Sequence, residues 1–285
     1  MKLLVTGGRG QLGRSVLARG AVHGHAIVAV DTEVDVCDAA QVDAALATHA
    51  PEAVVNAAAY TAVDKAETER ERAFAVNAEG AANVARACAR HGVPLLHVST
   101  DYVFDGTATR PYREDNPIAP LGVYGASKAA GEHAVLELGG TVVRTSWLFA
   151  TGGPSFVHTM LRLAAERPVL RVVADQHGCP TWAGDLADAL LALAARSARQ
   201  RIYHACGGEP TTWHAFAAAI VAEARRYRAL TCERIDAITT ADYPTPARRP
   251  AYSVLDTARL RADGVVVPSW RAGLARVIAD ELGGS

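Results

Sequence analysis

The sequence predicts an α/β fold in which a doubly wound parallel sheet is followed by a smaller C-terminal part. Three observations support this prediction. Short apolar runs alternate with helix-length, alanine-rich stretches through the first half of the chain. Those runs are apolar at nearly every position, which is typical of strands buried on both faces of a parallel sheet. After about residue 147, loops rich in glycine and proline separate the helical stretches.

The expected elements of the first half follow one another as strand, helix, strand. The expected strands are residues 3–6, 26–30, 53–56, 94–99 and 141–145, and the expected helices are 11–22, 39–49, 70–91 and 124–138. Past residue 147, helical patterns cover 183–199 and 212–227, and a strand at 201–205 is expected to return to the main sheet. YPTPARRP at 243–250 is too rich in proline for regular structure.

Composition describes an ordinary globular chain of 285 residues, half of them hydrophobic, with 29 basic and 30 acidic side chains. A net charge of −1 argues against a nucleic-acid partner, because such binding needs a basic face. No apolar run approaches the ~20 residues that cross a bilayer. The first residues already form a strand pattern, which leaves no room for a signal peptide. We therefore expect a cytoplasmic protein without a membrane partner.

The metal-binding residue types show no ligand pattern. The five cysteines are scattered without a C-x-x-C pair, and the ten histidines include no H-E-x-x-H motif. His97 lies in a strand pattern and is interpreted as a core or edge residue rather than a catalyst. The sequence therefore predicts no metal site and no disulfide scaffold.

A glycine-rich turn joins the first strand to the first helix. GGRGQLG at 7–13 is a G-x-x-G-x-x-G motif built on Gly7, Gly10 and Gly13. Such glycines let the backbone approach a pyrophosphate, and the helix N-terminus supplies unpaired N–H groups. Many tight turns bind nothing, but this one follows the first strand of an α/β series. We therefore predict an NAD(P)-binding Rossmann domain over 1–147 and a mainly substrate-binding part over 148–285, with about 181–206 returning to the Rossmann sheet.

An acidic residue ends the second strand. Asp31 lies 18 residues after Gly13, where a carboxylate can bind the adenine ribose; a helix cap is the alternative. The carboxylate would repel the 2′-phosphate of NADPH, whereas Arg9 would attract it. NADH and NADPH both remain open, with a slight preference for NADH. Small residues at 57–59 would let the cofactor approach closely, although they would equally suit helix packing.

A Y-x-x-x-K pair opens the helix expected over 124–138. Tyr124 and Lys128 share one helix face, which by itself is common on protein surfaces. Here the pair follows Ser99 and Thr100, which end the fourth strand at the same sheet edge. Thr100, or Ser99 in its place, would hold a substrate carbonyl while Tyr124 protonates it. We expect the Lys128 ammonium to lower the pKa of the tyrosine.

With these motifs, the sequence resembles the extended short-chain dehydrogenase/reductase superfamily and, within it, the dTDP-4-dehydrorhamnose reductase family. The matching stretches are GGRGQLG (7–13), VVNAAAYTAVDKAE (54–67), STDYVFDG (99–106), VYGASKAAGE (123–132), RTSWLF (144–149), DQHGCPT (175–181), TTWHAFA (211–217) and YPTPARRP (243–250). They cover nearly the whole chain. The resemblance implies an oxidoreductase that uses NADH or NADPH to reduce the 4-keto group of dTDP-4-dehydro-L-rhamnose, giving dTDP-L-rhamnose in the last step of dTDP-rhamnose biosynthesis.

The resemblance also assigns roles to single residues. The catalytic residues would be Tyr124, as the proton donor, together with Lys128 and Thr100. The cofactor-binding residues would be Gly7, Gly10, Gln11, Leu12, Gly13, Asp31, Ala59, Tyr60, Thr61, Tyr124 and Lys128. The substrate-binding residues would be Thr100, Asp101, Trp147 and Arg249. Many relatives carry histidine where Tyr60 stands, so Tyr60 is interpreted as contributing backbone contacts.

Some members of the family are dimers with Mg²⁺ at the interface, held by an acidic residue of the first helix. Arg14 and Ser15 stand there in this sequence, so no metal is expected, while a homodimer stays open. Other functions fit the same motifs. They are a reductase of another dTDP-4-keto-6-deoxysugar in antibiotic or polysaccharide biosynthesis, an epimerase or dehydratase, and a non-catalytic NAD(P)-binding regulatory subunit. The regulatory subunit is expected to lack the Tyr124/Lys128 pair.

Overall fold

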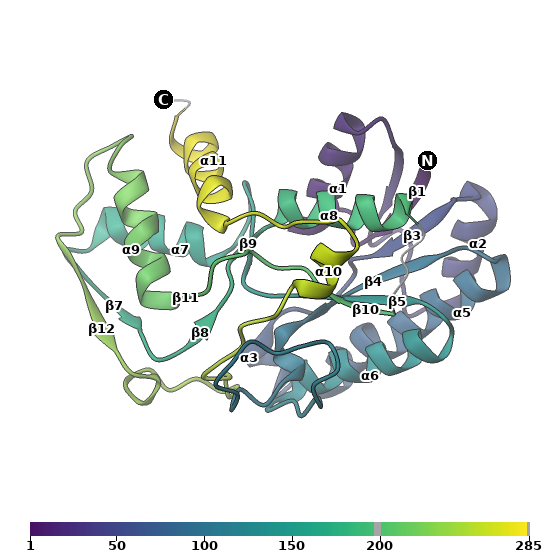
Figure 1. Cartoon of the computed structure of the whole chain (residues 1–285), viewed down its shortest axis with the longest axis horizontal. Coiled ribbons are helices and arrows are strands. Elements are labelled where there is room, and N and C mark those ends of the chain that lie inside the picture. Colours follow the sequence, from purple (N-terminus) through teal and green to yellow (C-terminus); the bar gives the residue numbers. More distant parts are fainter. Residues whose placement is uncertain (197–200, 284–285) are drawn as a thin grey trace.

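The computed structural model describes residues 1–196 and 201–283. A six-stranded parallel sheet with the order β10-β5-β4-β3-β1-β2 forms its centre (Figure 1). Its strands are β1 (Lys2–Thr6), β2 (Ala26–Val30), β3 (Ala53–Asn56), β4 (Leu95–Thr100), β5 (Thr141–Thr145) and β10 (Ile202–His204). The chain steps from β1 to β2 on one side and then crosses to β3 on the other, so the carboxyl end of β1 is a topological switch point. The predicted α/β class with a doubly wound parallel sheet is confirmed.

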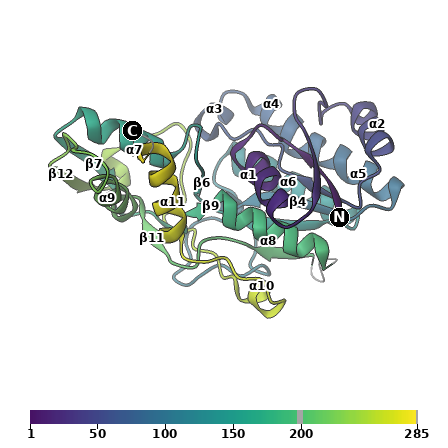
Figure 2. The same ribbon diagram turned by 90° about the horizontal axis from the view of Figure 1, so that it is seen from above.

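Helices cover both faces of this sheet (Figures 1 and 2). On one face lie α1 (Gln11–Val22) and α8 (Ala183–Ala195); on the other lie α2 (Ala39–His49), α5 (Ala81–His91) and α6 (Val123–Glu137). Alternate residues of β1 serve the two cores: Leu3 and Val5 pack with α1 and α8, and Leu4 packs with α2 and α5. Two-sided burial is therefore the reason that the strands are apolar at nearly every position.

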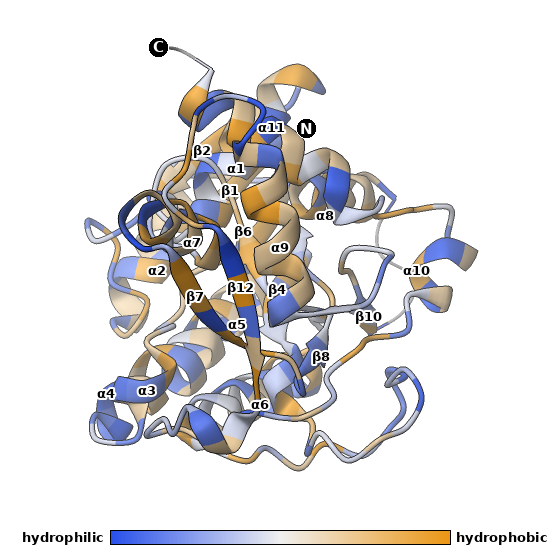
Figure 3. Cartoon of the chain, turned by 90° about the vertical axis from the view of Figure 1, so that its left-hand side faces the viewer, coloured by the Kyte–Doolittle hydropathy of each residue, from blue (hydrophilic) through white to orange (hydrophobic). Residues whose placement is uncertain are grey.

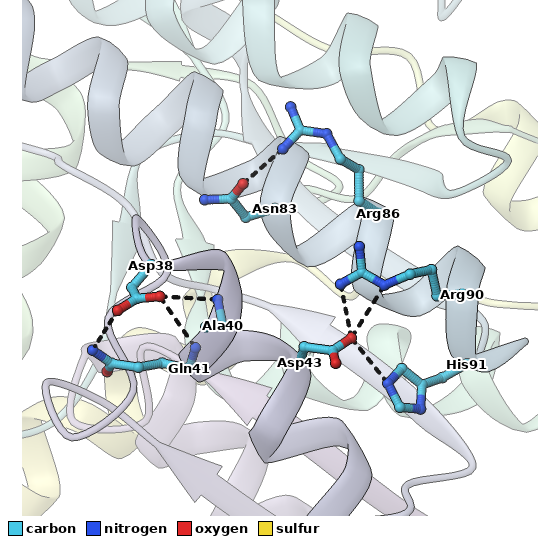
Figure 4. A network of polar contacts seen from close by, with 8 residues as sticks. All are labelled: Asp38, Ala40, Gln41, Asp43, Asn83, Arg86, Arg90 and His91. Carbon is cyan, nitrogen blue, oxygen red and sulfur yellow. Dashed lines mark hydrogen bonds and ion pairs between the residues drawn. The ribbon is translucent and has the colours of Figure 1, made fainter.

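Polar contacts join the outer surfaces of α2 and α5 (Figure 4). Asp38 caps the start of α2 by accepting backbone hydrogen bonds, one of them from Gln41. Asp43 of α2 accepts from Arg90 at 2.7 Å and from His91 at 3.1 Å, both on α5. These exposed contacts add modestly to stability; the helices are held mainly by the buried side chains beneath them.

One predicted helix is interrupted. The sequence predicts a single helix over 70–91, but the structure has α4 (Arg70–Phe74), a π-helical turn η1 (Ala75–Gly80) and then α5. The wider turn faces α6, and its Asn77 donates to the Ser127 hydroxyl of α6 at 3.0 Å. A helix-period pattern cannot reveal a π turn, because the extra residue is accommodated without a change in composition.

The C-terminal half builds a second, smaller core beside the sheet. Its helices α7 (Phe156–Glu166), α9 (Trp213–Ala224) and α11 (Trp270–Leu282) pack around Phe149, Phe216 and Trp270. Figure 3 shows β7 (Val169–Val173) and β12 (Arg234–Ile238) side by side in this half, where they pair in parallel. The remaining short elements are α3 (Val63–Ala66), η2 (Asp101–Val103), β6 (Leu148–Phe149), β8 (His177–Gly178), β9 (Thr181–Trp182), β11 (Thr211–Thr212), η3 (Thr240–Asp242) and α10 (Ala258–Ala262).

Three predicted helices end earlier than the sequence suggests, and the one expected at 124–138 does so by a single residue, at Glu137. The helix expected at 183–199 ends at Ala195, and its expected residues 197–199 lie outside the described part of the chain. The helix expected at 212–227 ends at Ala224. The strand expected at 201–205 is β10, which pairs with β5 at one edge of the main sheet. The division of the chain at residue 147 stays a prediction. Within residues 1–196 and 201–283, no helix combines the length and apolar character needed to cross a membrane.

Candidate active site

A cleft of about 1070 Å³ extends along the carboxyl ends of the parallel strands. This volume is slightly above the usual range for ligand pockets, about 300–1,000 Å³, which leaves room for more than one small molecule. The residues predicted from the sequence that line it are Gly7, Gly10, Gln11, Leu12, Gly13, Asp31, Ala59, Thr61, Thr100, Asp101, Tyr124, Lys128 and Trp147. The fold therefore brings the glycine turn, the Y-x-x-x-K pair and the end of β4 to one site.

The glycine turn has the geometry of a phosphate cradle. Gly7 has a φ of 69°, and a Cβ there would lie 2.7 Å from the backbone nitrogen of Ala58, so a larger residue cannot replace it. Gly10 begins α1 without a side-chain cap, and the first turn of α1, which the structure describes completely, carries no acidic residue. The first N–H groups of α1 are therefore available to an anion at the cleft.

Charges of both signs surround the expected adenine ribose position. The backbone N–H of Arg9 donates to the Asp31 carboxylate at 2.8 Å. The Arg9 guanidinium reaches the Thr32 hydroxyl at 3.1 Å and Glu33 at 3.2 Å. A 2′-phosphate would meet one cation and two carboxylates here. The charges at this position therefore attract and repel a 2′-phosphate at once, and they leave both nicotinamide cofactors open.

Tyr124 is held as a protonated phenol. Burial of its hydroxyl raises the pKa to about 12, while a hydrogen bond with the Thr100 side chain acts in the opposite direction. Tyr102 packs edge-on against its ring at 5.6 Å between centroids. The expectation that Lys128 lowers this pKa is wrong for the structure as it stands, because desolvation dominates and the lysine amine is bonded elsewhere. A protonated phenol is the state that a proton donor requires.

The Lys128 side chain is held in place by contacts with β4. Only 2% of its surface is exposed, and its Nζ donates to the Val98 carbonyl at 2.6 Å. The same Nζ lies 3.3 Å from Nε2 of His97. Burial lowers the pKa of Lys128 to about 8, against the opposing attraction of Glu132.

The hydroxyl groups of Ser99 and Thr100, at the end of β4, differ in their hydrogen bonds. Thr100 Oγ1 donates to the Asp101 carboxylate at 3.0 Å and accepts from the Tyr102 N–H at 3.2 Å. Burial raises the pKa of Asp101 to about 6. Ser99 Oγ is buried and has no partner among the described residues. Ser99 therefore remains a rival to Thr100 for holding a substrate oxygen.

Tyr60 does not line the cleft as the sequence suggested. Its phenol donates to Glu69 at 3.0 Å, and its backbone N–H and carbonyl both bond to the Asn77 side chain. Asn77 comes from the π turn and holds the loop after β3 in place. The sequence offered no signal for Asn77, because its role depends on a helix irregularity that brings its amide to a segment 17 residues away.

Arg249 also lies outside the residues that line the cleft. Its guanidinium bonds to both carboxylate oxygens of Asp64, at 2.9 and 3.1 Å. This pair connects the loop at 243–250 to α3. Contact between Arg249 and a substrate diphosphate therefore requires this pair to open, and it stays a prediction.

Trp147 borders the cleft in a strained conformation. It has a φ of 47°, which is rare for a bulky side chain. Its indole stacks on Trp213 with centroids 3.5 Å apart, and Gly178 lies beneath it, where a Cβ would come within 2.4 Å of the ring. Trp213 also lines the cleft, although the sequence had only suggested it as part of the TTWHAFA match.

Unpartnered polar atoms test whether a nicotinamide nucleotide fits. Within the described chain, Gln11 Oε1, Ser99 Oγ and Thr145 Oγ1 are buried without a hydrogen-bond partner, and all three residues line the cleft. Such atoms are rare unless a ligand or water meets them. Together with the uncapped start of α1 and the buried Lys128, they fit a polar dinucleotide. Among the described residues, no three His, Cys, Asp or Glu side chains form a group suited to a metal ion.

Comparison with known proteins identifies the family. The family model described as RmlD substrate binding domain matches residues 1–282. A dTDP-4-dehydrorhamnose reductase from Streptomyces griseus is 47% identical over 280 residues, which are 95% of this chain and 91% of that protein. The chain belongs to the dTDP-4-dehydrorhamnose reductase family. The resemblance found in the sequence motifs is thereby confirmed.

A solved structure of the reductase family has the same fold throughout. The dTDP-4-dehydrorhamnose reductase of Bacillus anthracis, in complex with NADP, superimposes with a TM-score of 0.91 at 36% identity and covers 98% of this chain and 99% of that one. A further relative, a probable dTDP-4,6-dihydroxy-2-methyloxan-3-one 4-ketoreductase of Streptomyces antibioticus, is 42% identical over 99% of this chain and 96% of its own length.

Proposed function

We propose that this chain is an NAD(P)H-dependent oxidoreductase that reduces the 4-keto group of dTDP-4-dehydro-L-rhamnose to give dTDP-L-rhamnose. The observation that carries the proposal is the meeting of Tyr124, Lys128 and Thr100 with the glycine turn in one cleft. The S. griseus and B. anthracis relatives, both named for this reaction, support the choice of substrate.

The chain's own residues supply the proton and the orientation. When bound, the reduced nicotinamide supplies the hydride. Tyr124, whose pKa is about 12, gives its proton to the carbonyl oxygen as that oxygen becomes an alkoxide. Thr100 or Ser99 orients the oxygen. Lys128 would stabilise the tyrosinate that remains and would hold the nicotinamide ribose.

The remaining cofactor and assembly assignments are part of the proposal. Both NADH and NADPH are accepted; the NADP complex of the B. anthracis relative supports the second. Gly7, Gly10 and Gly13 would hold the pyrophosphate, and Asp31 the adenine ribose. We also propose a homodimer in the cytoplasm. We propose no metal ion at the start of α1. Arg14, where some relatives carry an acidic metal ligand, donates instead to the carbonyls of Arg9 and Gly152.

A second candidate function is reduction of another dTDP-4-keto-6-deoxysugar. The S. antibioticus relative, whose name describes a different keto sugar, favours it at 42% identity. Both reactions use the same proton donor and cofactor, so the difference lies in the residues that face the sugar. A regulatory subunit is disfavoured, because the Tyr124/Lys128 pair is retained and lies in the cleft.

The experiment is a direct assay. The purified chain is incubated with the 4-keto-6-deoxy-L-lyxo-hexose ester of dTDP, made enzymatically in place, while NADH or NADPH absorbance is followed at ~340 nm and the sugar product is identified. Loss of absorbance with formation of dTDP-L-rhamnose supports the proposal and ranks the cofactors. Steady absorbance despite cofactor binding would overturn it and favour another keto sugar or a regulatory role.

A further inference from the structure

A line of buried polar side chains lies behind the catalytic lysine. It begins at Thr6 of β1 and passes through Asn56 of β3 and His97 of β4 to Lys128 of α6. The three contacts measure 2.7 Å (Thr6 Oγ1 to Asn56 Oδ1), 3.0 Å (Asn56 Nδ2 to His97 Nδ1) and 3.3 Å (His97 Nε2 to Lys128 Nζ). No member is more than 2% exposed. Because these side chains are buried away from water, each contact must pair one hydrogen-bond donor with one acceptor.

The backbone sets the orientation of the Asn56 amide. Its Oδ1 accepts the Ala58 N–H at 3.2 Å, and a backbone N–H can only donate. The same Oδ1 accepts the Thr6 hydroxyl. The other end of the amide, Nδ2, therefore faces His97 Nδ1, and an amide NH₂ likewise can only donate.

The amide in turn sets the tautomer of His97. Because Nδ1 accepts a hydrogen bond from Asn56, it carries no proton. Burial holds the pKa of His97 well below its ordinary value, so the ring is neutral and its single proton is on Nε2. This N–H points at Lys128 Nζ. An ammonium has no lone pair to accept it, whereas an uncharged amine has one and can still donate to the Val98 carbonyl at 2.6 Å.

We propose that His97 is a positioning residue, which presents an Nε2–H donor to Lys128 and favours the uncharged amine in the ligand-free chain. The effect is to shift Lys128 toward its uncharged form, so that less positive charge lies near the Tyr124 phenol before the reaction begins; that consequence alone rests on the proposed function. Proton donation by Tyr124 then leaves a negative charge on its own oxygen, which favours uptake of a proton from solvent by the amine.

Other titratable groups lie near Lys128 on its own helix and on the turn after β4. Tyr124, on the same helix as Lys128, is neutral. Glu132, on that helix too, attracts a Lys128 ammonium but is paired with Arg144 of β5 at 2.7 Å. From the turn after β4, Asp101 is buried and bonded to Thr100. Burial acts in the same direction as His97, since it lowers the pKa of Lys128 to about 8. The histidine donor therefore adds to desolvation.

The experiment uses the small number of lysines in the chain. The sequence contains Lys2, Lys65 and Lys128 alone, so ¹³Cε-lysine labelling gives three NMR signals that can be followed through a pH titration. The variant is His97→Asn, whose shorter side chain cannot reach Nζ. If His97 donates to the amine, its loss raises the titration midpoint of Lys128 by about one pH unit, while exposed Lys65 stays constant as the internal control.

The titration also has an outcome that contradicts the proposal. If His97 accepts from an ammonium, its loss lowers the midpoint; a lower or unchanged midpoint overturns the proposal. Long-range ¹H–¹⁵N spectra of the wild-type chain locate the His97 proton without any variant, and a proton on Nδ1 also overturns it. Neither readout needs turnover, so failure of the assay reaction is separate from failure of this inference. In an active enzyme, the pH profile of kcat/KM shifts in parallel with the Lys128 midpoint.

Discussion

The Trp147 indole lies flat on the Trp213 indole, with centroids 3.5 Å apart and planes 7° from parallel. Trp147 follows β5, whereas Trp213 opens α9, so the stack joins the sheet to the smaller half at the border of the cleft. The Phe156 ring also packs against Trp213, with centroids 4.6 Å apart. The stack therefore holds Trp147 in its left-handed backbone conformation.

Removal of the Trp213 ring tests this relationship. Trp213→Ala should raise the KM for the keto sugar by about three- to tenfold, because an aromatic pair contributes about 0.5–1.5 kcal/mol beyond its buried area. Trp213→Phe keeps a ring and serves as the matched control, with a smaller change. Steady-state kinetics of the two variants provide the comparison, and equal KM values for Trp213→Ala and the wild type would contradict a positioning role.

Tyr124→Phe removes the proton donor while keeping the ring. Turnover should fall by about 10²–10⁴, the usual contribution of general acid catalysis, and the dissociation constant of NADPH should stay within about twofold. Tyr112→Phe is the control, since Tyr112 bonds to Asp105 away from the cleft. The measurements are kcat and cofactor fluorescence titration. Full turnover in Tyr124→Phe would remove this residue from the mechanism.

Glu33→Gln should shift the cofactor preference toward NADPH. Glu33 now pairs with Arg9 on the surface, where the two side chains are 49% and 72% exposed. Its neutralisation frees the guanidinium for a 2′-phosphate and removes one repulsive charge, so the NADPH/NADH ratio of kcat/KM should rise about three- to tenfold, and less at high salt. Glu166→Gln, on remote α7, should leave the ratio unchanged. An unaltered ratio in Glu33→Gln means that Arg9 does not contact the cofactor.

Asp101→Asn should stabilise the chain in alkaline but not in acidic solution. Burial raises the folded-state pKa of Asp101 to about 6, above its unfolded value, so ionisation disfavours folding. This penalty is absent below the unfolded pKa and complete above about pH 6, and stability is lost as pH rises through that window. The variant should gain up to about 3 kcal/mol at about pH 8 and little at about pH 4.

Urea unfolding at both pH values measures this difference. Asp105→Asn is the contrasting control, because the hydrogen bond from Tyr112 lowers the pKa of Asp105, so its substitution should cost stability at the higher pH. Equal stability of Asp101→Asn and the wild type at both pH values would show that the Asp101 carboxylate is paired more favourably than its burial suggests.

Much of the cofactor end could be predicted from the sequence, because it depends on local rules. A strand followed by Gly7, Gly10 and Gly13 leads directly into a helix, and the backbone of that turn makes the site. Tyr124 and Lys128 share a face because they are four residues apart on one helix. Such features depend on residues close in the chain.

The rest depended on contacts between distant segments. Whether Arg249 meets a ligand or Asp64, 185 residues away, is decided by the position of a proline-rich loop. The Tyr60 phenol bonds to Glu69, and a π turn places the Asn77 side chain on the Tyr60 backbone. No local pattern encodes such choices, since each side chain has several partners within reach and packing selects one.

The sequence by itself determined the parallel α/β architecture, the cofactor turn and the identity of the catalytic pair, because apolar periodicity and backbone geometry act over a few residues. Only the tertiary structure decided the electrostatic state of that pair. His97, 31 residues from Lys128, reads as an ordinary strand residue until the sheet and α6 bring its Nε2 to the amine. Burial then strengthens each contact, because no water remains to replace a mismatched donor or acceptor.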